Sequence, residues 1–191
     1  MTHRALSRLP ALAAMALAAL PATAAPTAYV LDPEHTFVHF EFQHFATSTS
    51  RGRFGPLQGE VVLDRAAGRG EVSLRIATAS VDTGVPVFNA RLRQADLLAS
   101  EAWPEAYFVA RQVRFDGDRV AEVRGEFTLR GISQPLSLHA RRFACRQDER
   151  GEVCGGDFEG ELLRSDFGAT FGLPFVGDRV RLRVQVEGRR R

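Results

Sequence analysis

Strict alternation of apolar and polar residues is the feature that most restricts how this chain folds. The last such run places apolar residues at 180, 182, 184 and 186 and polar residues at 181, 183, 185 and 187. Successive side chains of a β-strand point to opposite faces, so this period indicates a strand with one buried face. Similar runs recur along the chain, which is therefore predicted to be all-β.

Eight segments are predicted to be strands, and clusters of turn-forming residues separate several of them. Their ranges are 29–45, 57–64, 70–78, 106–115, 119–130, 135–145, 155–165 and 179–188. Sequential strands of this kind suggest an antiparallel sheet, and closing the sheet into a barrel removes its unpaired edges. We therefore predict an eight-stranded antiparallel β-barrel. A bulge is expected at Arg111, where a polar residue interrupts the alternation.

The segment FNARLRQADLLASEAWPEAYF, residues 88–108, breaks the strand pattern because it is rich in Ala and Leu. Asn89 is a residue type that caps helix N-termini, and Pro104 is one that stops helices. Leu92, Leu97 and Leu98 share part of one helical face. A short helix is therefore predicted between the third and fourth strands, where it either closes one end of the barrel or fills the core.

The first 24 residues have the composition of a secretory signal peptide. Arg4 and Arg8 precede the 12-residue apolar run LPALAAMALAAL, and Ala22-Thr23-Ala24 fits an A-x-A cleavage signal. The run is shorter than the about 20 residues that span a bilayer. An uncleaved anchor or an ordinary buried helix is the alternative. We predict that residues 1–24 are removed on export and that residues 25–191 form a single domain.

The charge of the chain does not suit a nucleic-acid-binding protein. There are 25 Lys and Arg against 23 Asp and Glu, and every basic residue is Arg. Loss of residues 1–24 removes two Arg and no acid, so the mature net charge is near zero. A nucleic-acid binder would show a markedly basic domain or patch. Without lysine, a Schiff-base or P-loop lysine is also excluded.

The two cysteines, Cys145 and Cys154, flank the charged sequence RQDERGEV, which suits a hairpin loop. In an oxidising compartment such a pair usually forms a disulfide. Facing residues of an antiparallel hairpin have Cβ atoms about 4.5–5.5 Å apart, which a bridge needs only small adjustments to span. We predict a Cys145–Cys154 disulfide. A redox-active pair is the alternative, although the spacing is not C-x-x-C.

The segment TFVHFEFQH, Thr36–His44, is preceded by His35 and reads either as a metal site or as an apolar wall. Its even-numbered residues share one face of a strand, whereas His35 and His39 lie on the other. These two histidines are then roughly 13 Å apart along the strand, too far to bind one zinc ion at about 2 Å each. We predict no metal site. A metal-dependent enzyme built on His35, His39 and Glu41 is the alternative.

Enzyme motifs are absent from the sequence, so we predict no catalytic residues. No G-x-S-x-G motif surrounds any serine. The glycines of GRGEVS, Gly68–Ser73, lack the third member of a dinucleotide-binding loop and precede a strand. Asp116 and Asp118 lie in an evident turn, where Asp is common for conformational reasons.

The 14 phenylalanines fall mostly in the predicted strands. A small closed barrel either fills its interior with side chains or keeps room for one small ligand, and an apolar lining suits an apolar ligand. A solid core without a ligand is the alternative. The predicted wall residues of a ligand cavity are Val38, Phe40, Phe42, Leu74, Ile76, Leu92, Leu97, Leu98, Phe108, Phe127 and Phe167.

An ordered set of segments resembles the YceI-like family. The segments are YVLDPEHTFVHFEFQH, GRFGPLQGEV, ASVDTG, LRQADLLASEAWPEAYF, VRGEFTLRGISQPLSL and SDFGATFGLPFVGDRVRLRVQVEG, and they extend from Tyr29 to Gly188. Thr36, Asn89 and Trp103 depart from the residues usual in the family, which are Ser, Asp and Tyr, and none of these changes touches the apolar wall.

The resemblance implies a periplasmic, lipocalin-like barrel that holds a long polyisoprenoid chain, such as an isoprenoid quinone or a polyprenyl compound. We therefore expect an exported, non-enzymatic protein that carries or sequesters this lipid, without another cofactor and with transient membrane contact for lipid exchange. A structural or stress-related periplasmic interaction protein with a filled barrel is the alternative. The lipid and the oligomeric state are not fixed by the sequence.

Overall fold

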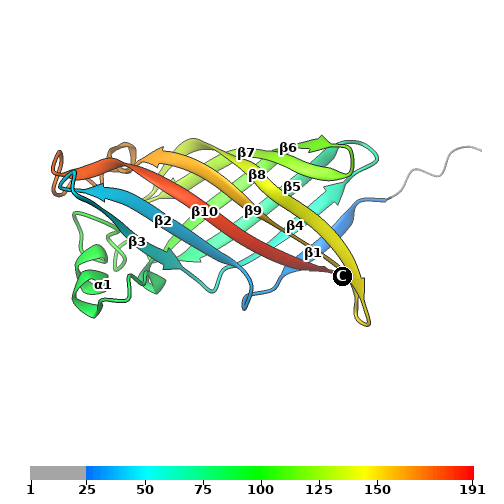
Figure 1. Ribbon diagram of the computed structural model, residues 1–191, viewed down its shortest axis with the longest axis horizontal. Coiled ribbons are helices and arrows are strands. Elements are labelled where there is room, and N and C mark those ends of the chain that lie inside the picture. Colours follow the sequence, from blue (N-terminus) through cyan, green and yellow to red (C-terminus); the bar gives the residue numbers. More distant parts are fainter. Residues whose placement is uncertain (1–24) are drawn as a thin grey trace, which may run out of the picture.

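A computed structural model describes residues 25–191 of the protein (Figure 1). The expected signal peptide, residues 1–24, lies outside the described residues. The strands are β1 (Thr27–Leu31), β2 (Phe37–His44), β3 (Ser48–Phe54), β4 (Gln58–Asp64), β5 (Arg69–Ala77), β6 (Glu105–Asp116), β7 (Arg119–Leu129), β8 (Ile132–Asp148), β9 (Gly151–Leu163) and β10 (Val176–Arg190). The helices are α1 (Pro86–Leu92) and the short 3-10 helices η1 (Thr78–Ser80) and η2 (Arg164–Phe167).

All ten strands belong to one antiparallel sheet that closes on itself. The ring runs in the order β1-β4-β5-β6-β7-β8-β9-β10, and pairing of β1 with residues 188–190 of β10 completes it. The hairpin of β2 and β3 extends this ring, because β2 pairs with residues 176–185 of the same β10 edge. The eight-stranded antiparallel barrel is confirmed, as is the short helix, which lies between β5 and β6.

The start of the chain differs from the sequence prediction of one strand over residues 29–45. A turn after β1 divides that strand, because the carbonyl oxygen of Asp32 accepts the N–H of His35 at 3.2 Å. The Asp32 carboxylate also accepts the N–H of Glu34 at 2.9 Å. Strand β3, which was not predicted, has mostly exposed or half-exposed polar residues. Its sequence STSRGRF therefore lacks the apolar alternation by which a half-buried strand is recognised.

The helical segment is shorter than predicted. Helix α1 begins at Pro86 and ends at Leu92, well before Pro104, and residues 93–104 form turns. Asn89 does not cap the helix. It lies within it, and its side chain accepts the N–H of Thr83 at 2.8 Å and donates to Asp82 at 3.1 Å. Within residues 25–191, no helix combines the length and apolar character needed to cross a membrane.

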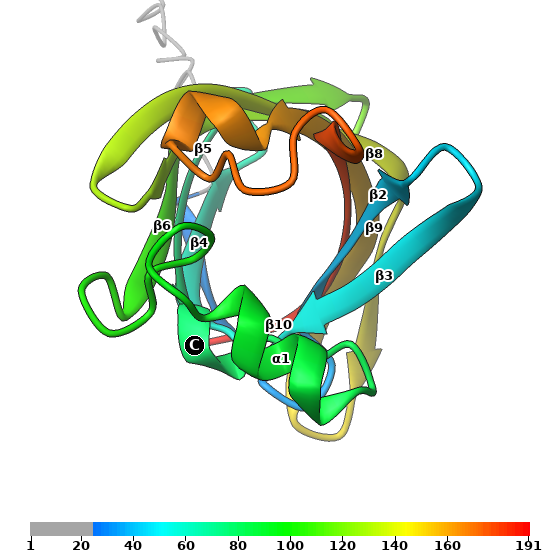
Figure 2. The same ribbon diagram turned by 90° about the vertical axis from the view of Figure 1, so that its left-hand side faces the viewer.

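Several irregularities shape the barrel wall, including register shifts within the pairs β6–β7, β8–β9 and β10–β2. The pairing of β6 with β7 shifts register between Ala110 and Gln112, so the bulge predicted at Arg111 is confirmed. Elsewhere in the wall, the outer edge of β3 meets the segment before α1. Arg53 and Asp82 exchange two backbone hydrogen bonds there, of 2.8 and 2.9 Å. The segment before α1 thus lies along β3, and Figure 2 shows α1 at the edge of this end of the barrel.

Candidate ligand-binding cavity

The interior of the barrel contains an apolar cavity of about 660 Å³. Its volume falls in the range of roughly 300–1,000 Å³ that is typical of small-molecule sites. Residues of β2, β3 and β10 and of the segment 78–98 provide most of its lining, and β5 to β9 supply the rest of the strand residues. A small closed barrel has two options, a filled interior or a ligand cavity, and this chain has the second.

All of the predicted wall residues except Phe167 line this cavity. Strand β2 contributes Val38, Phe40 and Phe42; β5 contributes Leu74 and Ile76; β6 and β7 contribute Phe108 and Phe127; and the helical segment contributes Leu92, Leu97 and Leu98. Phe167 is buried but does not reach the cavity. Its ring packs edge-on against Phe127, with centroids 5.5 Å apart. That the lining residues contact a ligand stays a prediction.

Several lining residues were not singled out from the sequence. They are inward residues of β8 and β10, namely Leu136, Leu138, Val180, Leu182 and Val184, together with Ala106 of β6. Most of them lie at the alternate positions by which the strands were recognised, so the same signal would have found them.

The cavity opens at the end of the barrel where α1 lies. Val85, Phe88 and Phe171 line the cavity and are also exposed to solvent. The polar residues of the lining include His44, Ser48, Ser50, Arg51 and Arg91. Helix α1 lies at the edge of this opening (Figure 2), and its residues Phe88, Arg91 and Leu92 line the cavity, so it borders the open end of the barrel.

One buried arginine organises the loop that forms part of this opening. The Arg164 guanidinium donates to the carbonyl oxygens of Gly177 at 2.9 Å, Phe171 at 2.9 Å and Val176 at 2.8 Å, and also to that of Ala169. Burial lowers the pKa of Arg164, and the negative charge of Asp178 opposes this effect. The loop between η2 and β10 is therefore fixed around a single cation.

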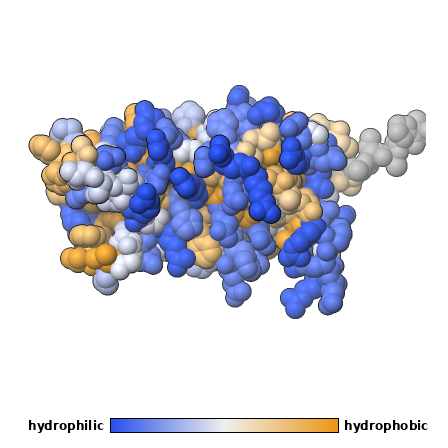
Figure 3. All heavy atoms as spheres, in the orientation of Figure 1, coloured by the Kyte–Doolittle hydropathy of each residue, from blue (hydrophilic) through white to orange (hydrophobic). Residues whose placement is uncertain are grey.

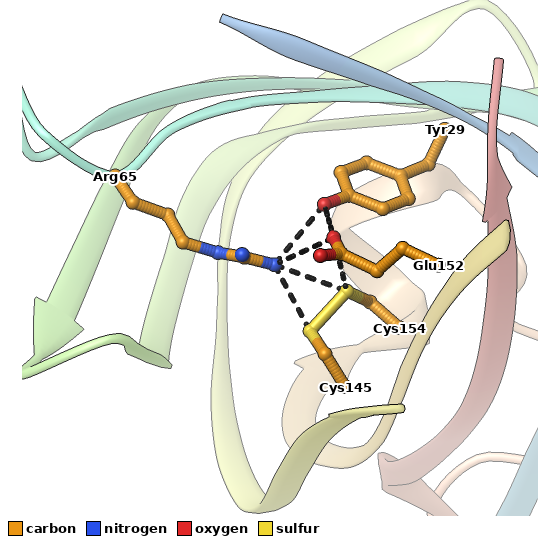
Figure 4. The surroundings of a disulfide bond; sticks show 5 residues. All are labelled: Tyr29, Arg65, Cys145, Glu152 and Cys154. Atoms are coloured by element: carbon orange, nitrogen blue, oxygen red, sulfur yellow. Dashed lines mark hydrogen bonds and ion pairs between the residues drawn. A yellow bond between two sulfur atoms is a disulfide. The ribbon is translucent and has the colours of Figure 1, made fainter. Parts of the chain in front are cut away.

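The opposite end of the barrel is closed by a polar cluster above a packed core (Figure 4). Nη2 of Arg65 lies 3.1 Å from the Tyr29 hydroxyl and 2.9 and 3.0 Å from the sulfurs of Cys145 and Cys154. The Tyr29 hydroxyl donates to Glu152. Beneath the cluster, inward residues such as Leu31, Leu63, Val120 and Phe158 are buried. This end holds only a small apolar gap of about 80 Å³.

The predicted Cys145–Cys154 disulfide is confirmed, and its two residues face each other across β8 and β9. The bridge closes a loop of sequence separation 9 at the end remote from the cavity opening. We expect replacement of both cysteines by Ser to lower the free energy of unfolding by roughly 2–3 kcal/mol and to leave ligand occupancy nearly unchanged. Denaturant titration and native mass spectrometry measure the two effects. Loss of ligand without loss of stability would contradict this expectation.

The phenol of Tyr29 should titrate at unusually high pH. Burial, followed by the hydrogen bond to Glu152, raises the pKa of Tyr29 to about 12. The folded protein thus holds this proton more tightly than the unfolded chain, whose Tyr pKa is about 10. The resulting stabilisation is complete below about pH 10 and is lost as the pH rises through about 12. In Tyr107→Phe, which leaves Tyr29 as the one tyrosine of the chain, ultraviolet absorbance should report phenolate formation near pH 12; ionisation near pH 10 would refute the assignment.

Possible metal ligands gather in two places within the described residues, both away from the cavity. Asp32, His35 and Glu187 bring ligand atoms within 4.8 Å of one another, as do Cys145, Glu152 and Cys154. In the second group the sulfurs are bonded to each other and a guanidinium lies against them. His39 belongs to neither group. Within residues 25–191, His35, His39 and Glu41 therefore do not gather around one position for a metal ion, as the alternative of a metal-dependent enzyme requires.

A closed antiparallel barrel with an apolar interior that opens at one end defines the class of β-barrel proteins with a cavity for an apolar ligand. The chain belongs to the YceI-like family, because the model of the YceI-like domain matches residues 29–188. The protein named Protein YceI from Escherichia coli O157:H7 is 32% identical over 164 residues, which cover 84% of this chain and 85% of that protein. The Shigella flexneri protein of the same name matches to the same extent.

Solved structures show the same fold at lower identity. BcnA of Burkholderia cenocepacia aligns with a TM-score of 0.68 at 20% identity, over 82% of this chain and 98% of that one. The YCEI protein of Campylobacter jejuni aligns with a TM-score of 0.66 at 22% identity, over 78% and 90%. A polyisoprenoid binding domain from Saccharophagus degradans aligns with a TM-score of 0.64 at 18% identity, over 85% and 98%.

Proposed function

We propose that this protein is an exported, periplasmic and non-enzymatic binding protein that carries or sequesters a long-chain isoprenoid lipid. The observation that carries the proposal is the apolar cavity of about 660 Å³ inside a barrel that opens at one end. The name of one structural neighbour, a polyisoprenoid binding domain, supports the choice of ligand. The charged, apolar and small-residue pattern of residues 1–24 supports export.

The chemistry of the cavity suits recognition by shape and desolvation. Burial of an apolar chain gains about 25 cal/mol per Å², and only part of this remains as affinity because ordering the chain costs entropy. One of the few polar groups in the lining, the Thr78 hydroxyl, already donates to the carbonyl oxygen of Trp103 at 2.8 Å. The polar residues near the opening, such as His44 and Ser48, are the ones that an isoprenoid head group would meet.

The alternative of a ligand-free interaction protein requires a barrel filled by its own side chains. The cavity volume argues against that alternative, since the phenylalanines line the interior without filling it. Transient contact with a membrane belongs to the proposal, because a bilayer is where a long isoprenoid is stored. An isoprenoid that crossed water unaided would expose its whole apolar surface.

Native mass spectrometry of the protein purified from a periplasmic fraction tests the proposal. We expect a mass above that of the bare chain, and collisional release of a ligand whose mass fits an isoprenoid quinone or a polyprenyl compound. Protein that carries nothing should take up an added isoprenoid alcohol in a one-to-one complex. Bare protein that takes up no added isoprenoid would refute the carrier role.

A further inference from the structure

Exposed apolar side chains are concentrated at the open end of the barrel. We call five of them the apolar rim: Phe45 in the β2–β3 turn, Val87 and Phe88 in α1, and Phe171 and Phe175 in the loop before β10. Val87 is 68% exposed and Phe175 is 67% exposed. Figure 3 shows strongly hydrophobic residues in separate groups at the end of the molecule where α1 lies, with paler ones elsewhere on this face.

Contacts within the rim hold its parts together across elements that are distant in sequence. The rings of Phe45 and Phe175 stack with centroids 6.0 Å apart. The Arg91 guanidinium lies over the Phe171 ring at 3.8 Å and pairs with Asp96 at 2.7 Å. The N–H of Phe45 donates to the carbonyl oxygen of Phe175 at 2.8 Å. The β2–β3 turn and the loop before β10 therefore present their exposed rings as one surface.

The closed end of the barrel has the opposite character. Its turns read DRAAGR at residues 64–69, DGDR at 116–119 and DERG at 148–151. Asp64, Asp116 and Asp148 each form an ion pair with an arginine in or near these turns. Monomeric proteins rarely leave contiguous apolar surface exposed unless it binds something. The contrast between the two ends therefore marks the rim as a contact surface.

The rim is continuous with the cavity. Phe88 and Phe171 belong to both, since they line the cavity and are exposed at its opening. A surface beside the opening controls what the opening faces, and an apolar ligand need not pass through water if the opening faces hydrocarbon. Aromatic and aliphatic side chains on short loops are also what peripheral proteins bury in the boundary between head groups and acyl chains.

We propose that the apolar rim docks onto the surface of a lipid bilayer and inserts Phe45, Val87 and Phe175 among the acyl chains. This places the cavity opening against the hydrocarbon. The inference rests on the proposed function for its purpose, whereas the docking itself requires no ligand. Because the inserted groups are apolar, binding to the bilayer should persist at 1 M salt. At that concentration the Debye length is about 3 Å, so attraction between surface charges is screened.

Vesicle sedimentation tests the docking directly. Protein without added ligand is mixed with vesicles of phosphatidylcholine and phosphatidylglycerol at low and at 1 M salt, and the bound fraction is measured after centrifugation. The test variant is Val87→Glu/Phe175→Glu, which changes two rim residues that do not line the cavity. The matched control is Val109→Glu, because Val109 is exposed on the outer face of β6, away from the opening.

We expect the unchanged protein and Val109→Glu to sediment with vesicles at both salt concentrations. The rim variant should bind at least tenfold more weakly, with unchanged circular dichroism. It should also take up a polyprenyl alcohol from cyclodextrin as the unchanged protein does, but accept it more slowly from vesicles.

Three outcomes would overturn the proposal: no sedimentation of the unchanged protein, equal sedimentation of the rim variant, or loss of binding at high salt. Self-association that the rim variant abolishes, without vesicle binding, would assign the rim to a second copy of the chain. Failure of the proposed function is a separate result. In that case the protein takes up no isoprenoid from cyclodextrin, while sedimentation still reports on the rim.

Discussion

Replacing Val180 by Trp is expected to lower the affinity for an added isoprenoid alcohol at least about tenfold, which corresponds to about 1.4 kcal/mol of binding free energy. Val180 lines the cavity from β10, where it faces Phe42 on one side and Leu162 on the other. A larger side chain at this position occupies space that the ligand would fill. The cavity accepts part of the indole, so the cost of overpacking stays within about 1–3 kcal/mol.

The matched control for this prediction is Val109→Trp, which introduces the same side chain on the outer face of β6. We expect it to leave occupancy unchanged. Isothermal titration with the alcohol dispersed in cyclodextrin, together with native mass spectrometry, measures both variants. Full occupancy of a folded Val180→Trp protein would show that the ligand does not lie in the barrel.

The second large effect is expected at Arg164. Its replacement by Met keeps an unbranched stem close to the aliphatic part of the arginine but removes the donors to the carbonyl oxygens of Phe171, Val176 and Gly177. Hydrogen bonds that involve a charged group contribute ~1.5–3 kcal/mol each. The loop regains some of them from water, so we expect the free energy of unfolding to fall by about 3 kcal/mol. Denaturant titration measures this loss.

Arg179→Met is the control for Arg164→Met. Arg179 pairs with Glu161 at 2.6 Å on the exposed surface, and such pairs contribute at most about 1 kcal/mol. Hydrogen exchange should separate the variants further, since only Arg164→Met removes protection from the amide of Val176, which donates to Gly172 at 2.8 Å. Equal stability of the two variants would mean that the loop does not depend on the buried cation.

Most of the barrel could be predicted because its strands have one solvent-exposed face and one buried face. Alternation located β5, β7 and β10 and also placed Phe40 and Leu74 on the inner wall. It missed β3, because Ser48 and Ser50 stand at positions of this strand that line the cavity, where an apolar residue would have marked it. It merged β1 with β2, because a turn held by the Asp32 carboxylate leaves the apolar pattern intact on either side.

The rest of the site depends on contacts between distant segments, which residue types alone do not reveal. Asn89 has the right chemistry for a helix cap, yet it binds Thr83 and Asp82 from inside the helix. Phe167 is apolar and buried, but it does not line the cavity. Its ring packs against Phe127, which does. The cluster of Tyr29, Arg65 and Glu152 comes from three parts of the chain that only the closed ring brings together.

Because the barrel is closed at one end and open at the other, a linear ligand inside it would have a defined orientation. Under the proposed function, we expect a linear amphiphile to enter tail first, with its tail pointing towards the closed end at Tyr29 and the disulfide and its head level with the entrance. From outside, such a complex displays the head and conceals the tail. A partner that contacts the entrance would then meet the same head group in complexes with lipids that differ only in tail length. The depth of the tube, rather than any chemical contact, sets how much tail is hidden before the excess must bend back or remain outside.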